Sequence, residues 1–235
     1  ESSTAITCDV RAADGSFVAG SWAKGGVCIV PLPGFRAWTP DDPYLYTLDI
    51  TCGEDRVESY FAMRSFGVGP DEDGLPRLLL NGRPYFHTGV LDQGYWPDGL
   101  YTAPSDAALE ADIALMKCMG FNMLRKHIKV EPLRWYYHCD RLGMLVWQDM
   151  PNGGGAYRLS TISLPLLTNR HRDDRDYAAF ARQEEAGRRE FSQELQQMVE
   201  HLYNCPCIAM WVPFNEGWGQ FDARETAARV ELAPA

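Results

Sequence analysis

The sequence has no apolar run of the roughly 18 residues that a membrane-spanning helix needs, and no basic and then apolar signal segment opens it. It also has no excess of basic residues, because 22 Lys and Arg stand against 32 Asp and Glu, for a formal net charge of −10. An acidic surface repels phosphate groups. The composition therefore argues against a membrane or a nucleic acid as partner.

A cysteine framework is absent as well. The seven cysteines are scattered, and an odd number without regular spacing favours free thiols in a reducing compartment. Cys205-Pro206-Cys207 has no second pair with which to form a structural zinc site. We therefore expect no metal site and a cytoplasmic rather than a secreted protein.

What the sequence does contain is typical of a globular protein, with 46% hydrophobic and 23% charged residues. In its first part, short alternating segments are separated by Gly and Asp clusters, the pattern of an antiparallel β-sandwich. The expected strands there are residues 5–10, 27–30, 46–50 and 60–63.

After the turn-rich link at residues 69–74, and a hairpin with an Asn81-Gly82 turn, strand and helix patterns alternate. This alternation predicts parallel βα units. We expect strands at residues 86–91, 121–127, 144–150 and 208–216. A helix is expected at residues 105–120 with Ser105 as N-cap, and a second helix at 131–143 with His138 on its surface. A long loop is expected at residues 151–177, followed by a third helix that ends near Tyr203.

The last of these strands is an apolar run that ends in Asn215 and Glu216, directly before Gly217. A carboxylate and an amide at the C-terminal end of a buried strand lie where a (β/α) barrel carries its catalytic residues. The alternative is that the two residues begin a solvated loop.

Polar residues also end the neighbouring strands. With period two, Arg125 and His127 share a face, and a buried Arg125 requires a carboxylate partner. Asp149 ends the next strand and is either a ligand for a substrate hydroxyl or the ion-pair partner of Arg125 or Lys126.

Aromatic residues gather in the loop at residues 92–102, which holds Tyr95, Trp96 and Tyr101. Flat aromatic faces beside carboxylates suit sugar rings, so Trp96 is a candidate substrate-binding residue. Packing of Trp96 against the barrel rim is the other interpretation.

Residues 211–222, Trp-Val-Pro-Phe-Asn-Glu-Gly-Trp-Gly-Gln-Phe-Asp, resemble the acid/base segment of family 2 glycoside hydrolases, the group of β-galactosidases, β-glucuronidases and β-mannosidases. Upstream segments resemble the same family in the same order, among them residues 38–46 and the Leu-Asn-Gly-Arg-Pro segment at 80–84. The resemblance implies that Arg125 and His127 bind the substrate, although the Arg125-Lys126-His127 segment is one residue shorter than the family's Arg-x-x-His spacing.

This resemblance implies an immunoglobulin-like β-sandwich over residues 1–67 and the first half of a (β/α)8 TIM barrel over residues 68–235. It leaves open whether the N-terminal part of the sandwich domain is present in this sequence. It implies that Glu216 is the acid/base, that Asn215 binds the sugar 2-hydroxyl and that Trp218 shapes the leaving-group side. The nucleophilic Glu of the family lies on a later strand, so this piece is expected to be inactive alone.

The implied activity is that of a retaining exo-β-glycosidase acting on a carbohydrate, with β-galactosidase as the first choice. The alternatives are a β-glucuronidase or β-mannosidase of the same family, or a catalytically dead carbohydrate-binding scaffold. Some family members bind Mg²⁺ or Na⁺, but no acidic and His cluster in this sequence supports such a site. Assembly as a homo-oligomer is left open.

Overall fold

The structure is a computed structural model that describes residues 4–24, 26–156, 158–169 and 172–231. The chain divides into two compact units. One comprises Glu1–Phe86 with Cys139–Gly143 and Cys205–Cys207, and the other comprises His87–His138, Met144–Asn204 and Ile208–Ala235. In the described part of the chain, no helix is long and apolar enough to cross a membrane.

The first unit contains an antiparallel sheet with strand order β2-β1-β3-β4. Its strands are β1 (Ala5–Arg11), β2 (Phe17–Lys24), β3 (Tyr46–Cys52) and β4 (Asp55–Phe61). Cys8 and Val10 of β1 pair with Ile50 and Leu48 of β3, so alternate residues supply one apolar face. The antiparallel strands predicted from the alternation at residues 5–10 and 46–50 are confirmed.

The strand predicted at residues 27–30 is wrong, because this segment is irregular. Val27 and Ile29 are 81% and 75% exposed, so the apolar alternation does not correspond to burial. Pro31 and Pro33 follow, and proline has no N–H to donate to a sheet. Strand β2 was not predicted, since its small Ala, Gly and Ser residues give little alternation.

A second small sheet of the first unit has the order β5-β6-β7. Its strands are β5 (Phe66–Pro70), β6 (Pro76–Leu80) and β7 (Arg83–Pro84). Asn81 and Gly82, with φ of 52° and 76°, provide the two positive φ angles of a tight hairpin turn, so the predicted hairpin is confirmed. The turn-rich link predicted at residues 69–74 forms the turn between β5 and β6. In this turn, Asp71 Oδ1 accepts a hydrogen bond from the N–H of Leu75 at 2.9 Å.

The second unit contains a parallel sheet with strand order β11-β10-β9-β8. Its strands are β8 (Gly89–Asp92), β9 (Met123–Lys126), β10 (Leu145–Asp149) and β11 (Ile208–Val212). Helices α1 (Asp106–Cys118), α2 (Leu133–Leu142) and α4 (Glu185–Leu202) lie between successive strands. The predicted βα alternation is confirmed, and the carboxyl ends of all these strands meet at one edge.

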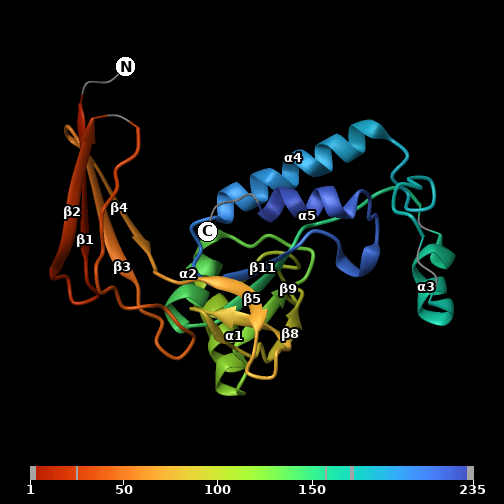
Figure 1. Ribbon diagram of the computed structural model, residues 1–235, viewed down its shortest axis with the longest axis horizontal. Coiled ribbons are helices and arrows are strands. Elements are labelled where there is room, and N and C mark those ends of the chain that lie inside the picture. The colour runs from red at the N-terminus through yellow and green to blue at the C-terminus, as the bar shows by residue number, and fades with distance from the viewer. Residues whose placement is uncertain (1–3, 25, 157, 170–171, 232–235) are drawn as a thin grey trace. The chain divides into compact units, whose positions relative to one another are not determined.

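Two helix signals in the sequence are confirmed. Ser105 caps α1, where its Oγ accepts from the N–H of Ala108 at 3.2 Å. The apolar stripe of α4 is buried, and it consists of Phe191, Leu195, Met198, Val199 and Leu202. Helix α5 (Ala223–Glu231) lies beside α4 (Figure 1).

Two other expectations about the helices are wrong. The predicted loop at residues 151–177 contains α3 (Leu159–Thr168), whose apolar sequence has no regular polar face and includes Pro165. His138 is not on the surface but 4% exposed, because its Nε2 lies 3.1 Å from Asp106 Oδ1 on α1.

A buried carboxylate holds parts of the first unit together. Asp140 is bound by the hydroxyl of Tyr60 at 2.8 Å and by the N–H of Cys207 at 2.7 Å. Its backbone oxygen accepts from the indole of Trp38 at 2.7 Å. Burial raises the pKa of Asp140 from its usual 3.8 to about 6, although these hydrogen bonds favour the charged form.

Since the folded chain binds this proton more tightly than the unfolded chain does, the stabilisation is complete below the unfolded pKa and is lost as the pH rises through about 6. We expect this group to lower the free energy of unfolding by about 2 kcal/mol between pH 4 and pH 7. The Asp140→Asn variant should lack this component in urea unfolding at the two pH values. Exposed Asp41→Asn serves as the control, and an unchanged pH dependence in Asp140→Asn would contradict the assignment.

Candidate active site

The carboxyl edge of the parallel sheet is organised by one arginine. Arg125, in β9, binds Asp149 of β10 through two hydrogen bonds, Nε to Oδ1 at 2.9 Å and one terminal nitrogen to Oδ2 at 3.1 Å. The same nitrogen donates to Asn215 Oδ1 at 2.8 Å. The expected carboxylate partner of Arg125 is therefore Asp149, and the contact extends to the segment after β11.

Burial makes this pair structurally important. The side chain of Asp149 is 0% exposed and that of Arg125 is 28% exposed. Of the two roles considered for Asp149, the ion pair with Arg125 is the one that the geometry shows. An arginine fork matches a carboxylate in two parallel bonds, so the pair fixes both orientation and distance.

Glu216 lies in a strained turn rather than at the end of a strand. Strand β11 ends at Val212, earlier than predicted, and Asn215–Gly217 form a 3-10 turn in which Glu216 has φ 52° and ψ 19°. A non-glycine residue in the left-handed region is uncommon and concentrates at functional sites. Glu216 is exposed, and its Oε2 accepts from the indole of Trp218 at 3.1 Å.

Aromatic rings pack against one another on both sides of this turn in the sequence. The ring of Phe214 stacks on that of Phe191, with centroids 5.1 Å apart, and Phe221 meets both rings. The guanidinium of Arg182 lies over Phe191, and its Nε donates to Gly219 O at 2.7 Å. Arg182 was missed from the sequence, because a backbone acceptor far along the chain leaves no pattern.

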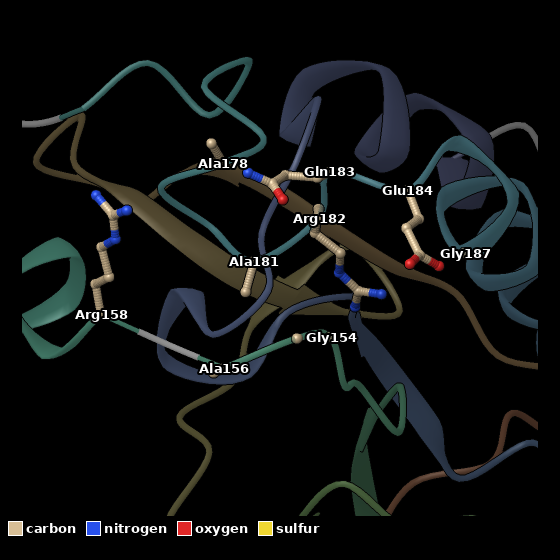
Figure 2. Close-up of a pocket in the computed structure, with 10 residues that line it drawn as sticks. Gly154, Ala156, Arg158, Ala178, Ala181, Arg182, Gln183, Glu184 and Gly187 are labelled. Atoms are coloured by element: carbon tan, nitrogen blue, oxygen red, sulfur yellow. The ribbon is translucent and has the colours of Figure 1, made fainter.

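A cavity of about 600 Å³ lies beside this support. Figure 2 shows Arg158 on one side of the cavity and Glu184 on the other, with Arg182 and Gln183 between them and Gly154 at the edge. The cavity is next to the turn, because Arg182 also holds Gly219. Among the described residues, no group of three or more His, Cys, Asp and Glu side chains is arranged to hold a metal ion.

The other predicted site residues belong to the edge formed by β8 and β9. His127 donates its backbone N–H to Asp92 O at 2.9 Å, and its Nδ1 lies 3.3 Å from Gln93 Nε2. Trp96 is partly buried in the loop after β8, where its backbone pairs with that of Leu100. The structure thus joins Arg125, Asp149, Asn215, Glu216 and Trp218 by direct contacts, whereas His127 contacts Asp92 and Gln93, and Trp96 pairs with Leu100.

A parallel sheet with alternating helices, and with an Arg, two acids and an amide at its carboxyl edge, has the architecture of a barrel-type enzyme site. The family profile described as "Glycosyl hydrolases family 2, TIM barrel domain" matches residues 76–231. The chain belongs to this family of glycosyl hydrolases.

Curated relatives carry the name β-galactosidase. The Vibrio cholerae protein is 29% identical over 183 residues, which cover 76% of this chain and 16% of that protein. The Lactococcus lactis protein is 26% identical over 187 residues, which cover 78% of this chain and 17% of that protein. The chain thus spans about a sixth of the length of these relatives.

Two solved structures with the same fold carry the name β-glucuronidase. The Dictyoglomus thermophilum enzyme has a TM-score of 0.73 at 19% identity, and the match covers 98% of this chain and 37% of the enzyme's chain. The Bifidobacterium dentium enzyme has a TM-score of 0.70 at 18% identity, and the match covers 89% of this chain and 31% of the enzyme's chain. Identities this low show the fold alone.

Removing one partner of the buried pair should be costly. We expect Arg125→Met to lower the free energy of unfolding by about 3 kcal/mol, because the carboxylate of Asp149 is then buried without its cation. The double variant Arg125→Met/Asp149→Leu should recover much of this loss. Exposed Arg36→Met, which breaks a surface pair with Asp42, is the control in urea unfolding. A double variant as unstable as the single one would argue against a charge effect.

Proposed function

We propose that the protein containing this chain is a retaining exo-β-glycosidase with Glu216 as its acid/base. The observation that carries this proposal is the chain of contacts Asp149–Arg125–Asn215, which fixes the residue directly before Glu216 at the carboxyl edge of the sheet. Membership of a glycosyl hydrolase family supports the hydrolytic class.

In the proposed reaction, the carboxylic acid of Glu216 gives its proton to the glycosidic oxygen as the bond to the anomeric carbon breaks. A second carboxylate, expected on a later strand outside this chain, forms an ester with that carbon. The Glu216 carboxylate then takes a proton from the water that attacks the anomeric carbon and releases the sugar.

Asn215 is proposed to bind the sugar 2-hydroxyl, and its contact with Arg125 supports a definite orientation. An arginine can only donate, so the amide presents Oδ1 to Arg125. Its Nδ2 is then directed elsewhere and can donate to the substrate. Trp218, which donates to Glu216, is proposed to shape the leaving-group side, and His127 and Trp96 to line the β8 side of the sugar site.

A β-galactoside is the proposed substrate, in keeping with the name of the curated relatives. A β-glucuronide is the second candidate, because the two solved structures described above are β-glucuronidases. A β-mannoside and a dead carbohydrate-binding scaffold remain alternatives. The proposed architecture is an immunoglobulin-like domain over residues 1–67, followed by the first half of a TIM barrel.

The test is hydrolysis of aryl β-galactoside, β-glucuronide and β-mannoside by the full-length protein and its Glu216→Gln variant. We expect kcat/KM to fall by about a thousandfold in the variant. Azide should restore part of the turnover of substrates with activated leaving groups, because it needs no general base. Glu225→Gln, at an exposed site on α5, should keep full activity. Full activity in Glu216→Gln, or none on any sugar in the parent protein, would contradict the proposal.

A further inference from the structure

Two tyrosines stand out on the loop that joins β8 to α1. Tyr95 and Tyr101 are 61% and 49% exposed, although they are large aromatic residues. Their rings meet edge to face, with centroids 5.0 Å apart and an interplanar angle of 84°. A hydrogen bond with Tyr95 is the main cause that raises the pKa of Tyr101. The two rings thus lie at nearly a right angle, and both are partly exposed to the solvent.

A buried lysine holds both ends of this loop. Lys129 is 4% exposed, and its Nζ donates to Gly94 O at 2.7 Å and to Tyr101 O at 2.8 Å. The same ammonium lies 2.8 Å from Glu131 Oε1 and 4.8 Å from the centre of the Tyr101 ring. One side chain therefore fixes the backbone on each side of Tyr95 and also contacts the second ring.

The loop backbone packs directly on the charged groups at Gly94, whose φ is 65°. A Cβ at this position would lie 2.9 Å from Lys129 Nζ and 3.1 Å from Lys126 Nζ, and closer still to Glu131 Oε1. Only glycine leaves room for this contact. The backbone at Gly94 is thus packed against the charged groups with no space for a side chain.

The same network continues toward Arg125. Lys126 Nζ lies 2.8 Å from Asp92 Oδ2 and 2.9 Å from Glu131 Oε1. Gln148 Nε2 donates to the backbone oxygens of Lys129 and Asp149, at 2.7 and 2.8 Å. Buried hydrogen bonds therefore connect the loop to the residue that binds Arg125.

We propose that Tyr95 and Tyr101 form a binding surface for the sugar ring of the substrate, and that Lys129 positions this surface. The C–H bonds of a pyranose pack on an aromatic face, and the tyrosine hydroxyls can bond to sugar hydroxyls. Because buried charges already order the loop, binding costs little conformational entropy. The identity of the ligand rests on the glycosidase function proposed above.

The experiment measures binding to the full-length Glu216→Gln protein by calorimetry, with methyl β-galactoside, methyl β-glucuronide and methyl β-mannoside as probes. We expect Tyr95→Ala and Tyr101→Ala each to raise the Kd of the bound methyl glycoside about fivefold. Tyr203→Ala, at a 39% exposed tyrosine at the end of α4, is the matched control and should leave Kd unchanged. Unchanged Kd in both loop variants, or no binding of any probe by the parent, would overturn the proposal.

A nitrophenyl glycoside of the same sugar serves as a second probe, which distinguishes contacts with the sugar ring from contacts with the leaving group. If the tyrosines contact the sugar ring, both probes lose affinity by the same factor. A loss confined to the nitrophenyl probe would overturn the proposal, because the rings would then bind the leaving group. If the full-length protein hydrolyses no sugar but binds a glycoside in a way that depends on Tyr95, the glycosidase function is contradicted and the binding surface is still supported.

The positioning role of Lys129 is tested by non-additivity. Lys129→Met should raise Kd at least as much as Tyr95→Ala, because the loop loses its attachment at Gly94 and Tyr101 and both rings lose their position. In the Tyr95→Ala/Tyr101→Ala background the same change should raise Kd no further, since Lys129 acts through the two rings. A further loss of affinity from Lys129→Met in that background would contradict this role, whatever the effect on stability.

Discussion

The buried ion pair between Arg125 and Asp149 is the constraint on which the site depends. Taking a carboxylate fully out of water is costly unless a matched cation and further donors compensate it. Here the guanidinium provides two bonds and still reaches Asn215, so the interaction that stabilises Asp149 also sets the position of the residue before Glu216. Stability and site geometry are therefore coupled in one group of atoms.

Around this pair, hydrogen bonds and ring contacts support the backbone of the candidate site. Glu216 occupies a left-handed backbone conformation, and such strain persists only where the surroundings enforce it. The stacked rings of Phe191 and Phe214 and the bond from Arg182 to Gly219 provide this enforcement on one side. Lys129 does the same for the loop after β8. Both edges of the site are thus ordered in advance, as a preorganised site requires.

Much of this architecture could be predicted from local patterns. The cap at Ser105 and the βα alternation depend on neighbouring residues, and the need of Arg125 for a carboxylate follows from its place on a buried strand. The roles of Lys129 and Arg182 could not be predicted, because their acceptors are backbone oxygens distant in sequence and carry no side-chain signature. Helix α3 was missed for a related reason, since its Leu, Ser and Thr residues, interrupted by Pro165, lack the period that distinguishes a helix.

The most direct test of this account is a crystal structure of the full-length Glu216→Gln protein with an uncleaved aryl β-glycoside. We expect the side chain at position 216 to lie within about 3 Å of the glycosidic oxygen, the reach of a general acid. We also expect Asn215 to donate Nδ2 to the sugar 2-hydroxyl while Oδ1 still accepts from Arg125. A sugar bound away from Asn215, or a glycosidic oxygen beyond the reach of position 216, would contradict this account.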